Sequence, residues 1–387
     1  MVSTRVVAAA WRPHKTETEL RITPANAVPR RSKDPRGEHV WGRLGTRPGT
    51  RLTGLSVVGG AGTSTQDEAL EGLGLSEDDF ALGIFDRCGV ERRHLNLDSD
   101  FLASNLQGRT AEVEQELLRQ ATEAIDKLDV DLGSVGTVLS SSLYSLGCPS
   151  LAHRLIEHYG MSPSTDKYHV TGVGCASAVP LLRLGTQIAH ADPSRQVLVV
   201  AAESMSSILM PAQDGDPRTK TVGSAIFGDG CAAALIGVDR SDAGPAILAT
   251  RVHQIPGTLD AVKITTDSRE SHLQLARDLP DVAAENLAEL VHDFLRSNHL
   301  SEGDVDHWIL HPGGRRIVEC ARDALGLDDE DVAVSWRALA NHGNVGTPSI
   351  FYVLDSTISE RRPAAGEHGL AVTIGPGVSV GLMLLQF

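Results

Sequence analysis

Residues 170–180 read VTGVGCASAVP, and two glycines in this stretch stand directly before a cysteine. Gly172 and Gly174 allow two interpretations, a phosphate-binding glycine loop or a turn that exposes the thiol of Cys175. A dinucleotide loop needs a third glycine and an acidic residue about 20 positions later, and a P-loop needs a lysine. This stretch has none of these. We therefore favour a turn that exposes the thiol, with a helix that starts just after Cys175 and directs free N–H groups at the sulfur.

The predicted helix cannot ionise the thiol by itself. Its dipole contributes at most ~2 kcal/mol, which corresponds to roughly 1.5 pKa units. A thiol with an ordinary pKa of about 8.5 would then be only partly ionised at neutral pH, so Cys175 needs a cationic partner. Pro180 removes one backbone donor near the helix start, which predicts an irregular first turn.

His311 is the candidate partner. It lies in DHWILHPGG (306–314), at the end of an apolar strand and before a glycine-rich turn, where functional side chains often lie. His342 is a rival, in ANHGNVGTPSIFYVLD (340–355). In that segment Asn344 could donate its amide to a developing oxyanion, or it could simply adopt a left-handed conformation in the turn.

The order Cys175, His311, Asn344 also occurs in papain-like proteases, which place their cysteine in C-G-[SA]-C-[WY] near the mature N-terminus. That motif is absent around Cys175, and the strand pattern in the middle of the chain is typical of an α/β protein. A protease of this class is therefore disfavoured.

Apolar strands and amphipathic helices alternate from residue 51 onward. The pattern predicts a layered α/β fold with two similar halves, 51–245 and 246–387. We also expect two hairpins. One turns at residues 228–230 in SAIFGDGCAAALIGVDR, and the other is formed by LAVTIGPGVSVGLMLLQF at 370–387.

Composition limits the class of protein. The 387 residues carry a net charge of −15, which disfavours nucleic acid as a partner, and no uninterrupted apolar run reaches membrane-spanning length. The five cysteines lack disulfide or zinc spacing, so we expect no metal and a cytoplasmic location. Residues 1–50 carry a net +6 and many prolines, which predicts a disordered basic extension.

Five segments in this order resemble type III polyketide synthases, the chalcone-synthase-like branch of the thiolase fold. They are GVGCASA (172–178), IFGDGCAAALIG (226–237), HWILHPGG (307–314), HGNVGTPSIFYVLD (342–355) and IGPGVSVGLMLLQF (374–387). The resemblance extends from about residue 52 to residue 387 and implies a thiolase-like α-β-α-β-α fold.

The resemblance also implies roles for individual residues. Cys175 would carry the growing acyl chain, His311 would pair with it as an imidazolium, and His311 and Asn344 would hold a malonyl thioester carbonyl. The other implied site residues are the gating Phe227, the pocket residues Leu273 and Ile208, the backbone turn Gly375, Pro376 and Gly377, and the CoA-binding Arg87, Arg92 and Arg93.

The implied reaction is an iterative decarboxylative Claisen condensation of malonyl-CoA, followed by cyclisation, with no separate cofactor and in a homodimer. The sequence around Cys175 and Asn344 most resembles that of bacterial 3,5-dihydroxyphenylacetyl-CoA synthases, which use malonyl-CoA as starter and extender. Two alternatives stay open: a ketosynthase III-type enzyme that uses an acyl carrier protein, and a non-catalytic acyl-CoA-binding protein of the same fold.

Overall fold

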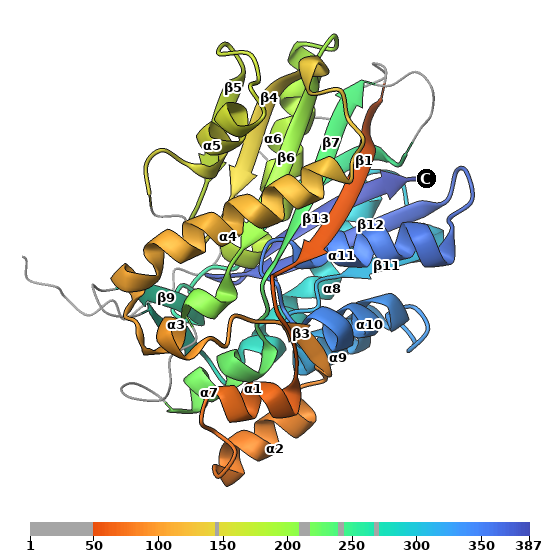
Figure 1. The fold of residues 1–387 in the computed structure, drawn as a ribbon. Helices are drawn as coiled ribbons and strands as arrows, with labels where there is room; N and C mark the ends of the chain where they lie inside the picture. Colours follow the sequence, from red (N-terminus) through yellow and green to blue (C-terminus); the bar gives the residue numbers. More distant parts are fainter. Residues whose placement is uncertain (1–48, 144–146, 209–216, 239–243, 267–270) are drawn as a thin grey trace, which may run out of the picture. The chain divides into compact units, whose positions relative to one another are not determined.

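The computed structural model describes residues 49–143, 147–208, 217–238, 244–266 and 271–387 (Figure 1). Nearly all of the predicted basic extension, residues 1–48, lies outside the described residues. Within the described residues, no helix combines the length and apolarity needed to cross a bilayer.

Nine of the described strands form one mixed sheet in the order β11-β12-β13-β8-β1-β7-β6-β4-β5. The strands are β1 (Thr50–Gly59), β4 (Val135–Ser141), β5 (Asp166–Val170), β6 (Gln196–Glu203), β7 (Gly230–Val238), β8 (Ala246–Gln254), β11 (His307–Leu310), β12 (His368–Gly375) and β13 (Ser379–Gln386). Among the described residues, the pairing of Arg51 with Ala246 joins the strands of the first half to those of the second. The predicted division at residues 245 and 246 stays a prediction.

Two short antiparallel pairs lie outside this sheet. They are β2 (Thr63–Thr65) with β3 (Arg92–His94), and β9 (Val262–Thr266) with β10 (Ser271–Leu275). The helices are α1 (Gln66–Gly72), α2 (Asp79–Arg87), α3 (Ser99–Ala103), α4 (Leu106–Asp126), α5 (Leu151–His158), α6 (Ala178–Ala191), α7 (Pro217–Ile226), α8 (Leu279–Ser297), α9 (Arg315–Leu325), α10 (Ala333–His342) and α11 (Ser349–Ser356). Short helical turns are η1 (Leu132–Ser134), η2 (Gly174–Ser177), η3 (Met205–Ile208), η4 (Glu302–Asp304) and η5 (Thr357–Arg361).

The apolar core divides into three layers because alternate residues of a strand face opposite sides of the sheet. In β6, Val197 and Val199 belong to the central layer with α6 and α11, whereas Leu198 and Val200 belong to the outer layer with α4 and α5. Figure 1 shows α4 crossing the strands of this half.

The second half repeats this division. In β12, Ala371 contributes to the central layer, while Leu370 and Val372 contribute to a third layer with α8 and α9. One apolar layer between the two sets of strands and one on the far side of each set give helix, strand, helix, strand and helix, the α-β-α-β-α arrangement that the resemblance implies. Helix α6, which follows Cys175, lies in the middle of this arrangement.

The two hairpin predictions have different outcomes. The closing hairpin is confirmed, since β12 and β13 pair from His368–Gln386 to Gly375–Ser379. The prediction of a hairpin at residues 228–230 is wrong, because the apolar run before the turn is the end of helix α7 and not a strand. Phe227 instead forms an isolated parallel bridge with Asn344.

Candidate active site

Cys175 lies in η2, a 3₁₀ turn that leads directly into α6. Pro180 is the third residue of α6, and the turn before the helix is irregular, as predicted. Gly172 and Gly174 have φ values of +81° and +59°, which favour glycine. A Cβ on Gly174 would lie 2.8 Å from ring atoms of Pro376, so a side chain there would displace the nucleophile turn.

The turn between β12 and β13 packs against the nucleophile turn from the other half of the chain. A Cβ on Gly375 would lie 2.5 Å from the backbone nitrogen of Ala176. Gly377 has a φ of +63° and closes the turn. The segment from 375 to 377 therefore brings backbone close to Cys175.

His311 follows strand β11 and is buried. Its backbone N–H donates to the Val372 carbonyl at 2.9 Å, and its carbonyl accepts from Gly313 at 2.8 Å. The imidazole Nδ1 has no partner among the described residues. Burial lowers the pKa of His311 to about 4, so the imidazole is neutral at pH 7.

Backbone hydrogen bonds fix Asn344 beside the turn that carries Phe227. The Asn344 N–H donates to Ile226 at 2.6 Å, and its carbonyl accepts from Gly228 at 3.1 Å. Gly343 and Gly346 have positive φ values in this loop, and Asn344 does not. The left-handed role considered for Asn344 is therefore wrong.

The side-chain amide of Asn344 is oriented by three groups. Its Oδ1 accepts from the Gly346 N–H at 2.9 Å and from the Ser349 hydroxyl at 3.3 Å, while its Nδ2 donates to the Gly313 carbonyl at 3.2 Å. The Cys175 Sγ lies 3.9 Å from Oδ1. One Nδ2 hydrogen is used in these contacts, so the second can serve a ligand.

Cys175, His311 and Asn344 line one cavity of about 610 Å³. Phe227 and Leu273 also line it, together with Gly375 and Pro376. Most of the remaining wall is apolar, and it includes Leu143, Met205, Val222, Ile226, Ile264, Leu275 and Ile374. The three predicted chemical groups, distant in sequence, therefore share one largely apolar chamber.

Two predicted pocket positions are not among the described lining residues. Ile208 ends η3 and packs against the apolar core, whereas Met205 at the start of η3 reaches the cavity wall. Gly377 shapes the turn behind Pro376 without lining the cavity. Met205 at the start of the same 3₁₀ turn lines the described cavity, and the pocket role of Ile208 stays a prediction.

The three predicted CoA-binding arginines lie in different environments. Arg87 lines the cavity, but Arg92 is exposed on β3 and is not part of the described lining. Arg93 is fully buried and donates to the Gln66 side chain and to the carbonyls of Ser224 and Ala225, so its role is structural.

Four further arginines line the cavity: Arg218, Arg277, Arg315 and Arg316. Sequence reasoning missed all four. Arg315 and Arg316 directly follow HPGG and open helix α9, so a basic pair next to the candidate histidine was the available signal. Arg218 and Arg277 had no comparable signal, because the surrounding fold brings them to the cavity.

The resting charges at the nucleophile differ from those that the resemblance implies. Burial, and to a lesser degree the nearby Glu203 carboxyl, raise the pKa of Cys175 to about 12, against the weaker effects of hydrogen bonds from its own backbone and from Asn344. With His311 also neutral, the cavity of the free protein contains a thiol and an imidazole, not a thiolate and an imidazolium. His311 can then act as a base when a thioester arrives.

Glu203 is a site residue that sequence reasoning missed. It ends β6, is buried and lines the same cavity as Cys175. Burial raises the pKa of this carboxyl to about 8. The available signal was an acidic residue at the end of an otherwise apolar strand, where a charge is costly without a purpose.

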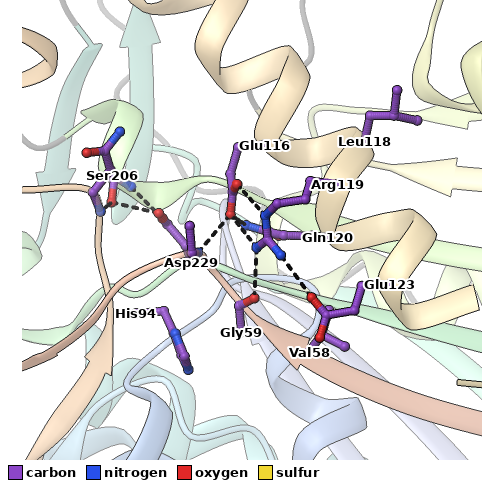
Figure 2. A network of polar contacts seen from close by, with 12 residues as sticks. Val58, Gly59, His94, Glu116, Leu118, Arg119, Gln120, Glu123, Ser206 and Asp229 are labelled. Atoms are coloured by element: carbon purple, nitrogen blue, oxygen red, sulfur yellow. Dashed lines mark hydrogen bonds and ion pairs between the residues drawn. The ribbon is translucent and has the colours of Figure 1, made fainter. Parts of the chain in front are cut away.

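A polar network holds the turn after Phe227 (Figure 2). Asp229 accepts from the backbone N–H and the hydroxyl of Ser206, both at 2.7 Å, and burial raises its pKa to about 7. Its N–H donates to the His94 carbonyl at 2.8 Å. Nearby, Glu116 accepts from Arg119 at 2.7 Å. The bonds of Asp229 anchor the turn that follows Phe227.

Two family models match the chain. The model for chalcone and stilbene synthases, C-terminal domain, matches residues 247–387, and the model for FAE1/type III polyketide synthase-like proteins matches residues 70–296.

Curated relatives agree with these models. A 3,5-dihydroxyphenylacetyl-CoA synthase of Amycolatopsis balhimycina is 30% identical over 355 residues, covering 87% of this chain and 93% of the relative. The alpha-pyrone synthesis polyketide synthase-like Pks18 of Mycobacterium tuberculosis is 30% identical over 269 residues, covering 68% of each chain.

A solved structure supports the fold. Polyketide synthase PKS-I from the brown alga Ectocarpus siliculosus superposes with a TM-score of 0.79 at 24% identity, covering 87% of this chain and 98% of that one. The family-model matches, the relatives and the shared architecture lead to one assignment: this chain belongs to the type III polyketide synthase family of acyltransferases, built on the thiolase fold.

Proposed function

We propose that the protein condenses malonyl-CoA iteratively on an acyl chain bound to Cys175 and cyclises the product. One observation carries the proposal: Cys175, His311 and Asn344 line a single apolar cavity whose other lining residues include five arginines. A nucleophile, a base and an amide donor in a chamber of low polarity are the groups that acyl transfer and enolate formation require.

The first step loads a starter acyl group. The neutral imidazole of His311 takes the proton of the Cys175 thiol as the sulfur attacks the thioester carbonyl of acyl-CoA. A new C–S bond forms at Cys175, the bond to CoA breaks, and the imidazolium returns its proton to the CoA sulfur. Neither the thiolate of Cys175 nor the imidazolium of His311 needs to exist in the free enzyme, which agrees with the pKa values of the two groups.

The second step builds a carbon–carbon bond. Malonyl-CoA loses carbon dioxide, and the electron pair of the broken C–C bond moves onto the thioester as an enolate. N–H groups of Asn344 and His311 stabilise the enolate oxygen. The enolate carbon attacks the acyl group on Cys175 and the C–S bond breaks, so that the chain on CoA is two carbons longer. Cys175 leaves as a thiolate, which takes up a proton from solvent.

The arginines along the cavity supply the charge that a CoA substrate needs. Arg315 and Arg316 open helix α9, whose N-terminus also favours anions. Guanidinium groups bind phosphates with paired hydrogen bonds, so Arg87, Arg315 and Arg316 are the proposed phosphate contacts. CoA enters here as substrate, and no separate cofactor is proposed.

The product proposed first is 3,5-dihydroxyphenylacetyl-CoA or its acid, formed from malonyl-CoA alone, as the name of the Amycolatopsis relative suggests. A second candidate is an α-pyrone from an aliphatic starter. It is favoured by the aliphatic wall around Leu143, Met205 and Leu275 and by the 30% identity to Pks18.

Mass spectrometry of products from malonyl-CoA alone tests the proposal. A dihydroxyphenylacetyl product supports the first candidate, and product formation only after addition of a long acyl-CoA supports the second. Strict dependence on an acyl carrier protein would overturn both and favour the ketosynthase III-type alternative. Absence of any condensation with every acyl donor would favour a non-catalytic acyl-CoA-binding protein.

We also propose a homodimer in which a second copy covers the β5 edge of the sheet. β5 ends the strand order, and its Tyr168 side chain is 48% exposed. An exposed strand edge is a surface that another chain can pair with. Light scattering should show a dimer that Tyr168→Glu weakens, while Phe80→Glu, at an exposed apolar residue of α2, leaves it intact. A wild-type monomer would contradict this proposal.

A further inference from the structure

Glu203 is tied to the nucleophile turn through one hydroxyl group. Its Oε2 accepts from the Leu143 N–H at 2.8 Å, and its Oε1 lies 3.2 Å from the Oγ1 of Thr347. The same Oγ1 lies 3.0 Å from the carbonyl oxygen of Gly174, the residue before Cys175. Glu203, Thr347 and Gly174 are all buried, so solvent does not substitute for these contacts.

The count of hydrogens decides how these contacts can form. A threonine hydroxyl carries one hydrogen, yet Thr347 faces two oxygen acceptors, the Gly174 carbonyl and Glu203 Oε1. If Glu203 is ionised, one of the two contacts has no hydrogen between its oxygens. If Glu203 carries a proton on Oε1, it donates to Thr347 and Thr347 donates to Gly174, and both contacts are satisfied.

The charges around Glu203 favour the same state. Within the described residues no arginine, lysine or histidine forms an ion pair with Glu203. Burial raises its pKa to about 8, against the opposing effects of hydrogen bonds from the Leu143 N–H and from the hydroxyl and backbone N–H of Thr347. The titratable groups that interact with it are Cys175 from η2, Asp229 before β7, and Cys231 on β7. None of these is a cation, so none stabilises a carboxylate here.

We propose that Glu203 acts as a neutral carboxylic acid that positions Cys175, donating to Thr347 so that Thr347 donates to the Gly174 carbonyl. The inference rests on the proposed function, because condensation at Cys175 gives a purpose to this chain of hydrogen bonds, the Glu203 relay. The thiolate and the enolate both carry negative charge in this cavity, and a carboxylate at position 203 would oppose each of them. A neutral acid fixes the turn without that repulsion.

The first test measures alkylation of Cys175 by iodoacetamide between pH 6.5 and pH 9.5 in the wild type and in Glu203→Gln. An amide can replace a neutral acid here, since its N–H can donate to Thr347 and its oxygen can accept from Leu143. We expect rates within about twofold at pH 7, and at pH 9.5 a variant about tenfold faster than the wild type, where the carboxylate has formed and raises the thiol pKa. Asp229 titrates in both proteins, so it cancels in the ratio.

The second test observes the proton itself. Infrared difference spectra of the wild type against Glu203→Gln at pH 6.5 should contain the carbonyl band of a protonated carboxyl. Thr347→Val should shift this band to higher frequency because the acid loses its acceptor, and Thr347→Ser should not. The comparison of the two Thr347 variants needs no change at Glu203, so it holds even if Glu203→Gln fails to fold.

The third test is kinetic. Thr347→Val should lower kcat for condensation about tenfold with little change in KM for malonyl-CoA, the expected loss of about one hydrogen bond in a positioned site, and Thr347→Ser should restore kcat. A Glu203→Gln enzyme more than tenfold slower in alkylation at pH 7, or spectra without the acid band, would overturn the inference by showing that Glu203 works as a carboxylate.

Alkylation and infrared spectra need no malonyl-CoA, which separates this inference from the proposed function. A protein that passes both tests but makes no polyketide refutes the proposed function alone. A protein that makes polyketide without the acid band refutes the Glu203 relay alone.

Discussion

At the inner end of the cavity, His311 and Asn344 are held by backbone hydrogen bonds and buried among apolar residues, whereas Arg315 and Arg316 at the start of α9 are exposed. Arg315 pairs with Glu319 at 2.8 Å and Arg316 with Asp281 at 3.3 Å, and each arginine side chain is more than half exposed. His311 and Asn344 are therefore neutral and fixed in position. Arg315 and Arg316 are charged, and solvent surrounds more of their side chains.

This difference indicates how each region can be altered. A buried group that is positioned by several bonds contributes through its exact place, so its loss is large and specific. An exposed charge acts through the field that it adds to its neighbours, so its loss is small and depends on salt. Variants of the two regions should therefore differ in size of effect, in the kinetic constant affected and in salt dependence.

The largest effect is expected from Cys175→Ala. Without the sulfur no acyl intermediate forms, and condensation should fall by at least about a thousandfold. Binding of CoA, measured by calorimetry, should be unchanged because the arginines are intact. Substantial polyketide formation by this variant would remove Cys175 from its proposed role.

Asn344→Ala should come next, with malonyl-CoA decarboxylation lowered by about 10²–10³-fold, the usual cost of losing one oxyanion donor. Asn344→Asp is the matched variant, because a carboxylate can still accept from Gly346 and Ser349 but cannot donate. Both variants should lose decarboxylation, measured by release of carbon dioxide. Normal decarboxylation by Asn344→Asp would show that the N–H donor is not needed.

The double variant Arg315→Ala/Arg316→Ala should raise KM for malonyl-CoA by about tenfold with kcat nearly unchanged, since two exposed charges contribute about 0.5–1 kcal/mol each. The difference from the wild type should shrink at high salt. Arg322→Ala is the control, as Arg322 lies on the same helix, pairs with Asp323 and Asp329, and is not part of the described cavity lining. An equal effect of Arg322→Ala would mean that the cavity position of the pair is irrelevant.

The smallest effects are expected from substitutions of Arg87 at the end of α2 and Arg92 on β3, and the two should differ. Arg87→Ala should raise KM for malonyl-CoA about two- to fivefold, because Arg87 lines the cavity, and Arg92→Ala should leave it unchanged. Steady-state kinetics at low ionic strength measure both. A larger effect at Arg92 would restore it to the CoA-binding region.

The pH dependence of acyl loading tests the charge states of the buried groups His311 and Cys175. With the pKa of His311 at about 4 and that of Cys175 at about 12, neither group titrates between pH 5 and pH 11. Loading, measured as kcat/KM for the starter acyl-CoA, should show no inflection from this pair, and a fall above pH 8 should disappear in Glu203→Gln. An inflection near pH 6.5 that is absent in His311→Gln would instead show an imidazolium in the free enzyme.

Local patterns made much of the fold predictable. A helix after Cys175 was predictable, although α6 begins at Ala178 and a 3₁₀ turn precedes it, and the closing hairpin was predictable from a Gly-Pro-Gly turn between two apolar runs. The run before residue 228 could not be assigned by pattern, because three apolar residues fit a strand and a helix end equally well. The fold decided it, by pairing Phe227 with Asn344.

The site was predictable where chemistry and sequence position coincide. Cys175, His311 and Asn344 each lie in a turn between elements, within two residues of a glycine, and the structure brings them to one cavity. Arg93 shows the limit, since its charge suggested a phosphate site while its strand position turns it inward. Glu203 could not be recognised as a partner of Gly174, because only the fold places Thr347 between them.

The contact between Gly375 and Ala176 has a consequence for biosynthesis of the enzyme itself. The turn at 375–377 emerges from the ribosome about 200 residues after Cys175, a delay of about 10–40 s at ordinary rates of translation. Until then, nothing closes the side of the nucleophile turn that Pro376 covers. The nucleophile turn therefore reaches its complete packing only after residue 377 has been synthesised, however early the strands beside Cys175 form.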